Sequence, residues 1–255
     1  MNIISGFADI SLAQLLLVAC VALFASVVGG FAGYGTGALM PLVLVPLIGA
    51  EPVVPIIAIS AVFTNLSRTA AYLRHVDRRR VLIVVAAAAL TTALGAYGYT
   101  RLTNAGAALV IGTMLISSVP LRRLLKRRDI RIGDTGLTVG AVGYGVVVGG
   151  TSGSGVILLS LLMAAGLEGA AVIATDAVIS VATSMIKISV FGLAGVVTAQ
   201  VLAFAVLIGG LALPGTFLAR AFVARMPVHI HTAILDAAVI AGGVVMISAA
   251  TRQLL

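Results

Sequence analysis

The segment GGFAGYGTGALMP, residues 29–41, places several glycines and a threonine inside an otherwise apolar stretch. A second segment, GGTSGSG at residues 149–155, repeats this pattern in the other half of the chain. Glycine is a poor helix former, so both segments predict a break in a helix. The interrupted helices are apolar, since 61% of all residues are hydrophobic and 9% are charged, a composition typical of integral membrane proteins.

Several apolar stretches approach or exceed the roughly 20 residues that a helix needs to cross a bilayer. They are residues 11–28, 52–73, 81–100, 104–121, 168–192, 197–219 and 230–250. These stretches take up nearly all of the 255 residues, and we therefore expect no soluble domain at either end or in a loop. The sequence predicts an all-α, polytopic membrane protein that works within the bilayer.

The net charge of +8 comes from basic residues that gather between the apolar stretches. The two densest clusters are RHVDRRR at 74–80 and RRLLKRRDIR at 122–131. Lys and Arg in short loops orient a membrane protein, and loops rich in them face the cytoplasm. We therefore expect both clusters inside the cell, an inner-membrane location with lipid as the surroundings, and no nucleic-acid partner.

The two halves of the chain resemble each other. GYGTG at 33–37 aligns with TSGSG at 151–155, a shift of 118 residues, and TNLSR at 64–68 aligns with TSMIK at 183–187. Such self-similarity indicates an internal duplication. We predict a first membrane repeat over 1–122, a basic cytoplasmic linker over 123–132 and a second membrane repeat over 133–255.

Each repeat contains a short apolar arm after its glycine segment, at 36–48 and 154–166. As helices these arms would be about 20 Å long, less than the roughly 30 Å hydrocarbon core. We predict that each arm pair forms a re-entrant or strongly bent hairpin, followed by three transmembrane helices, so the second repeat is inverted. The inverted arrangement puts the uncharged 193–196 loop outside and Arg220 and Arg225 inside; four full spans per repeat would put these arginines outside.

Inverted repeats with broken helices near the midplane are the plan of many secondary transporters. Helices that begin near Thr36 and Ser154 would point unpaired backbone N–H groups and positive dipole ends at a cavity, which favours a small anion. Glycine lets a ligand approach the backbone closely. The alternative is that the glycines only allow helices to pack tightly.

Two basic residues, Arg68 and Lys187, occupy matching places inside apolar stretches, where a charge usually lines a cavity. Thr64 and Thr183 lie one helical turn earlier, so each repeat offers a hydroxyl and a cation. The alternative is that both cations extend to the membrane surface. The predicted substrate-binding residues are Gly33, Gly35, Thr36, Gly37, Thr64, Asn65, Arg68, Thr151, Ser152, Gly153, Ser154, Gly155, Thr183, Ser184 and Lys187.

Asp176 is an intramembrane carboxylate with no acidic counterpart in the first repeat. We interpret it either as a proton carrier for coupling or as a helix cap in the headgroup region. His229 and His231 have the spacing of a metal pair but no nearby carboxylate or cysteine, so we expect neither metal nor cofactor. Hydrolase and nucleotide-binding motifs are lacking, and we expect no enzymatic activity.

The doubled turn, Gly33-Tyr-Gly-Thr-Gly and Gly150-Thr-Ser-Gly-Ser-Gly, resembles the TauE/SafE sulfite exporter family, also called the toluene sulfonate uptake permease family. Thr36, Ser152 and Ser154 interrupt the glycine runs that are usual there. The resemblance implies an inner-membrane secondary transporter for sulfite, sulfonates or other small organic anions, with proton coupling and a homodimer both open. The alternatives are a passive anion channel and a membrane scaffold or enzyme without transport.

Overall fold

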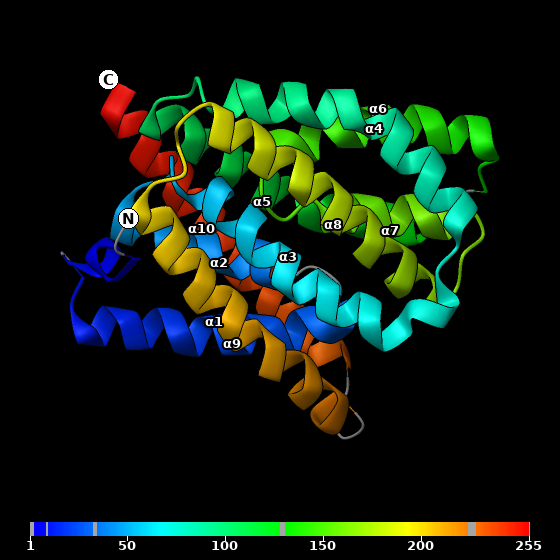
Figure 1. Cartoon of the computed structure of the whole chain (residues 1–255), viewed down its shortest axis with the longest axis horizontal. Helices are drawn as coiled ribbons and strands as arrows, with labels where there is room; N and C mark the ends of the chain where they lie inside the picture. Colours follow the sequence, from blue (N-terminus) through cyan, green and yellow to red (C-terminus); the bar gives the residue numbers. More distant parts are fainter. Residues whose placement is uncertain (1–2, 9, 33–34, 128–130, 224–227, 255) are drawn as a thin grey trace.

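The computed structural model describes residues 3–8, 10–32, 35–127, 131–223 and 228–254, and this part of the chain is all-helical without a strand. Figure 1 shows the helices lying roughly along one direction. The α-helices are α1 (Leu12–Ala32), α2 (Gly35–Ile48), α3 (Val53–Tyr72), α4 (Arg78–Tyr99), α5 (Asn104–Arg127), α6 (Asp134–Gly150), α7 (Gly155–Ala164), α8 (Ala170–Leu193), α9 (Ala199–Val223) and α10 (Val228–Leu254); two 3-10 helices are η1 (Ile3–Phe7) and η2 (Leu73–His75).

Four segments of the described chain are long and apolar enough to cross a membrane by length and composition. They are Val53–His75, Arg78–Tyr99, Asn104–Leu121 and Ala170–Leu193. Many large apolar side chains point outward from these helices, among them Leu82, Leu90 and Leu193. Such a surface is stable in lipid and costly in water. The predicted all-α, polytopic membrane fold is confirmed.

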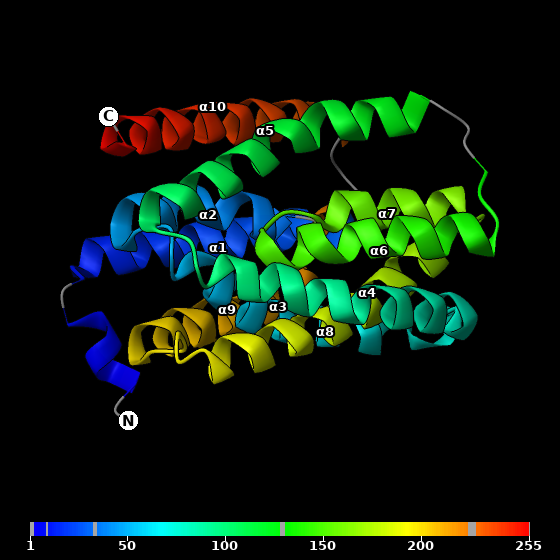
Figure 2. The same ribbon diagram turned by 90° about the horizontal axis from the view of Figure 1, so that it is seen from above.

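The helices pair in the same way when each of α1–α5 is exchanged with its counterpart in α6–α10, so that α1 corresponds to α6, α2 to α7, and so on. Helix α4 packs along α6, and its counterpart α9 packs along α1; α3 packs on α8 and α5 on α10, which are pairs of equivalent helices. With five helices in each half, equivalent helices run in opposite directions. Figure 2 shows this for α1, which runs from left to right, and α6, which runs from right to left. The packing agrees with inverted repeats.

The ends of the bundle differ in charge. Helix η2 and the C-terminal end of α5, which belong to the two basic clusters, lie at the same end of the bundle (Figures 1 and 2). The loop at 193–196, which carries no charge, lies at the opposite end, together with η1 and the end of α10. This arrangement is the one that the positive-inside rule requires. Residues 224–227, which include Arg225, lie outside the described residues.

Both glycine segments interrupt the helices, but later than their first glycines. Helix α1 continues through Gly29 and Gly30 to Ala32, because a glycine inside a helix costs only about 1 kcal/mol. At 21 residues α1 measures about 31 Å. The other three arms, α2, α6 and α7, have 14, 17 and 10 residues and are shorter than the hydrocarbon core. The arms predicted to be too short to cross alone, 36–48 and 154–166, correspond to α2 and α7, and both are shorter than the core.

Helix α6 is held against α4 by close backbone contact. A Cβ atom on Gly149 would lie 2.2 Å from the carbonyl oxygen of Thr92, and one on Gly95 would lie 2.3 Å from that of Val146. Only glycine permits this approach. The contact joins the first half to the hairpin of the second half, and it positions the break that follows Gly150.

Candidate functional site

The two glycine turns meet at a cavity of about 120 Å³, lined by residues of α1, α2, α3, α6, α7 and α8 and of the turn between α6 and α7. A water molecule needs roughly 10–15 Å³ measured in this way, so the cavity has room for a small anion. The structure brings together at its wall every substrate-binding residue predicted from the sequence except Gly33, which lies outside the described residues. They are Gly35, Thr36, Gly37, Thr64, Asn65, Arg68, Thr151, Ser152, Gly153, Ser154, Gly155, Thr183, Ser184 and Lys187.

The turns touch each other through glycine. A Cβ atom on Gly37 would lie 2.9 Å from the backbone nitrogen of Gly153, and Gly153 itself has φ +82°, a conformation that other residues rarely adopt. Helix α2 begins at Gly35 and α7 at Gly155, close to the starts expected at Thr36 and Ser154. The first N–H groups of both helices therefore have no partner within their own helix and lie at the cavity wall.

Lys187 of α8 lies inside the bundle with 5% of its surface exposed. Its Nζ donates a hydrogen bond to the carbonyl oxygen of Thr151, at 3.2 Å. That carbonyl is free to accept because α6 ends at Gly150. Within the described residues Lys187 forms no ion pair with a carboxylate. An ammonium has three donors, so this buried cation retains donors for a ligand.

Arg68 of α3 is equally buried but has an acidic partner. Its Nη2 donates to Oδ2 of Asp176 at 2.8 Å, and its Nη1 donates to Oδ1 of Asn65 at 3.0 Å. The side chains of Arg68 and Asp176 are 7% and 0% exposed. The alternative in which Arg68 and Lys187 extend to the membrane surface is therefore wrong, because both end inside the bundle.

Asp176 is not a helix cap. Helix α8 begins at Ala170 with Gly169 at its N-cap, so Asp176 lies inside the helix and fully buried. It is also not unpaired, as the sequence suggested, because its partner Arg68 comes from the other repeat, 108 residues earlier. The repeat alignment concealed the pair, since it matches Arg68 with Lys187 and gives no acidic residue opposite Asp176.

The threonine hydroxyls, which were expected to be donors to a ligand, are bonded within their own helices. The Oγ1 atoms of Thr64 and Thr183 donate to the carbonyl oxygens of Ala61 and Ser180 in their own helices, as threonine in a helix commonly does. Thr151 likewise donates to Val147. By contrast, the hydroxyl of Ser152, a residue that is 2% exposed, has no hydrogen-bond partner among the described residues.

Sequence reasoning missed part of the wall. The additional lining residues are Ser26, Ile57, Ala58, Ala61, Tyr144, Val148 and Ser180. Tyr144 is detectable afterwards, because it precedes Thr151 by seven positions, about two helical turns, and so lies on the same face of α6. The small apolar residues carry no signal that distinguishes them from ordinary helix packing.

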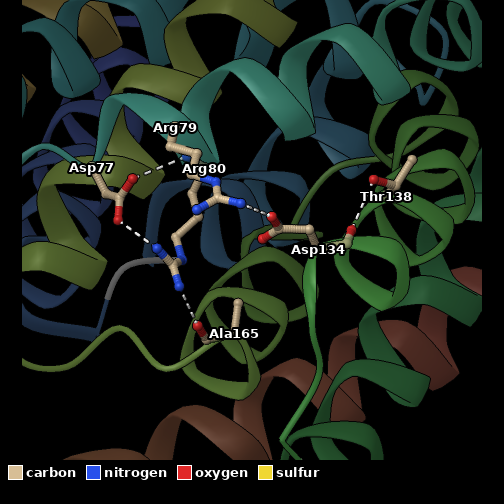
Figure 3. Close-up of polar contacts among 6 residues, drawn as sticks. All are labelled: Asp77, Arg79, Arg80, Asp134, Thr138 and Ala165. Atoms are coloured by element: carbon tan, nitrogen blue, oxygen red, sulfur yellow. Dashed lines mark hydrogen bonds and ion pairs between the residues drawn. The ribbon is translucent and has the colours of Figure 1, made fainter.

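A second polar cluster lies where α4 begins (Figure 3). Oδ1 of Asp77 accepts from the backbone nitrogen of Arg80, and Oδ2 accepts from its guanidinium, at 3.0 and 2.8 Å. Nη2 of Arg80 donates to the carbonyl oxygen of Ala165, and Arg79 pairs with Asp134. Partial burial raises the pKa of Asp77, but the Arg80 hydrogen bonds outweigh this and hold the pKa below its ordinary value of 3.8. The sequence identified these arginines only as orienting charges.

The helices and the cavity together define a multi-pass membrane protein whose polar, cationic site is enclosed by two related halves. The model of the sulfite exporter TauE/SafE family matches residues 18–246, most of the chain. The chain belongs to this family, and the predicted resemblance is confirmed. Membership makes the protein a membrane transporter of the sulfite or anion exporter type. No curated protein and no solved structure matches the chain.

Proposed function

We propose that the protein is a secondary transporter that carries a small organosulfur or other organic anion across the inner membrane by alternating access. The observation that carries this proposal is the buried cavity where Lys187, Ser152 and the starts of two helices converge. A buried ammonium without a carboxylate partner is costly, and a bound anion offsets that cost.

The cavity offers an anion three kinds of donor. Lys187 supplies charge, Ser152 supplies a buried hydroxyl, and α2 and α7 supply backbone N–H groups at Gly35 and Gly155. Sulfite, sulfonates and carboxylates all present several oxygens within a few ångströms, which suits donors that converge from different helices.

The contacts between the two halves support alternating access. The Arg68–Asp176 pair joins α3 to α8, and the cluster at Asp77 joins α4 to α7 and α8 at the cytoplasmic end. These bonds are made between repeats rather than within one. We infer that they hold one conformation and that the bonds at Asp77 break when the site opens to the cytoplasm.

Proton coupling is the finer part of the proposal. Asp176 is buried next to the cavity wall, and protonation would release Arg68 from its ion pair. The charged and titratable groups around it are Arg68 in α3, Tyr144 in α6, and Asp77 with Arg80 at the start of α4. A proton on Asp176 and an anion near Arg68 would then support each other.

The test is uptake of labelled sulfite, small sulfonates and carboxylates into proteoliposomes, with and without a pH gradient. Saturable uptake that falls in Lys187→Gln but not in Arg252→Gln, which removes an exposed cation at the end of α10, is the expected result. Conductance without saturation or coupling would instead indicate a passive channel. A folded protein that moves none of these anions would refute transport and favour a scaffold.

A further inference from the structure

We infer that the cavity selects monovalent anions over divalent anions of the same size. The inference rests on the proposed function, because it assumes that the cavity binds an anion. It comes from the distribution of charge around the site, in which two cations are present and one of them is already neutralised.

Two cations and one nearby carboxylate set the charge of the site. Among the described residues that line the cavity, the cations are Arg68 and Lys187. Asp176 lies behind Arg68 and bonds its Nη2 at 2.8 Å, so this pair is neutral as a unit. Among the described residues, the hydrogen-bond partner of Lys187 is the neutral carbonyl of Thr151. With Lys187 protonated, the site as a whole therefore carries a net charge of +1.

While Asp176 is ionised, a second hydrogen bond helps to hold Arg68 in its ion pair. Asn65 accepts from Nη1 of Arg68 one helical turn away, so the guanidinium is held from two sides. Asp176 is completely buried and does not line the cavity, whereas Arg68 does. The pair thus presents a polar but uncharged wall, and the charge that attracts a ligand is that of Lys187.

A monovalent anion leaves this site neutral, whereas a divalent anion leaves one buried negative charge without a partner. An uncompensated charge inside a protein is strongly unfavourable. Even with the generous screening that suits protein interiors, one elementary charge at ligand distance changes binding by tenfold or more. We therefore expect at least a tenfold preference for a monoanion when size and shape are equal.

Methanesulfonate and sulfate are suitable probes. Both are tetrahedral around sulfur and close in size, one carries a single charge and the other two, and neither changes its charge near neutral pH. The measurement is their affinity for the purified protein in detergent by calorimetry, checked by their competition with uptake in proteoliposomes. The unaltered protein should bind methanesulfonate at least tenfold more tightly than sulfate.

The variants change the charge of the site in single steps. Asp176→Asn raises it to +2 and should shift the affinity ratio toward sulfate by tenfold or more. The double variant Arg68→Gln with Asp176→Asn returns it to +1 and should restore the original ratio. Lys187→Gln lowers it to zero and should weaken both probes. Size-exclusion profiles and thermal unfolding establish that each variant is folded.

Three results would overturn the inference: equal or tighter binding of sulfate by the unaltered protein, an Asp176→Asn variant with the same ratio as the double variant, or transport of another anion with neither probe bound. If Asp176→Asn does not fold, the double variant still tests the inference. Its ratio of methanesulfonate to sulfate affinity should equal that of the unaltered protein, and a different ratio would contradict the charge assigned to the site. Failure to bind or transport any anion would refute the proposed function itself, and so differs from a wrong charge preference.

Discussion

Arg68 in α3 and Lys187 in α8 occupy equivalent places in the two repeats, yet their surroundings are opposite. Arg68 is bonded to the carboxylate of Asp176 and to Asn65, whereas Lys187 meets only the backbone carbonyl of Thr151. Both are buried to the same degree. Asp176 thus makes the first cation part of an ion pair, while the second keeps its charge available.

The largest effect is expected for Lys187→Gln. Because Lys187 supplies the net charge, the change should lower anion affinity and uptake by roughly 100-fold, the scale observed when one member of a buried charged contact is removed. Folding should be preserved, since Lys187 contributes a single hydrogen bond to a carbonyl. Initial uptake rates in proteoliposomes measure the effect. Uptake unchanged within twofold would show that the two cations do not differ as described.

The next largest effect is expected on the stability of the protein when the partner of Arg68 is removed. Asp176→Asn should lower the free energy of unfolding by about 3–5 kcal/mol, because it leaves a buried guanidinium without its counter-ion. Adding Arg68→Gln should recover part of that loss. Thermal unfolding in detergent of the parent, both single variants and the double variant gives the coupling between the two residues. Additive losses would mean that the pair contributes no coupling.

The glycine turns provide a smaller test. Gly37→Ala would place a Cβ atom 2.9 Å from the backbone nitrogen of Gly153 and force the two turns apart, at a cost of about 1–3 kcal/mol. Anion uptake should fall as the helix starts separate. Gly98→Ala in α4 is the matched control, because nothing lies within 4 Å of its added atom. Equal stabilities of the two variants would show that the two turns accommodate the added methyl group without a steric clash.

The smallest effect is expected at Asp77, outside the cavity. Its pKa is lower in the folded protein than its ordinary value of 3.8, so the stabilisation that it gives is present above that value and is lost as pH falls through the folded pKa. Asp77→Asn should cost about 0.5–1 kcal/mol at neutral pH, since the side chain is partly exposed and an amide still caps α4. Melting temperatures of both proteins should converge in acid. A constant difference down to the lowest pH would contradict this.

Much of the fold follows directly from the sequence because it depends on local composition. The lengths of the apolar stretches give the helices, and the glycine segments give two breaks at a distance of half the chain. The cavity wall follows as well, since Gly35, Thr36, Ser154 and Lys187 are polar or flexible positions in an apolar background. Their role in binding an anion stays a prediction, as do the boundaries of the repeats.

The contacts between distant side chains were beyond sequence reasoning. The partner of Asp176 lies 108 residues away at a position that the repeat does not match, and no periodicity points to it. The hydroxyl of Thr64 is a donor in principle, but local geometry commits it to the carbonyl of Ala61. The run of glycines at 29–30 remains helical because neighbouring apolar residues outweigh its weak preference for other conformations.

The ion pair between the halves also makes the two halves unequal. The residue that corresponds to Asp176, by the shift of 119 that aligns Arg68 with Lys187, is Ile57. A chain made of two first halves would bury two arginines with no acid to meet them, and a chain of two second halves would bury two lysines and two aspartates. Neither half can therefore replace the other unless several residues change at once.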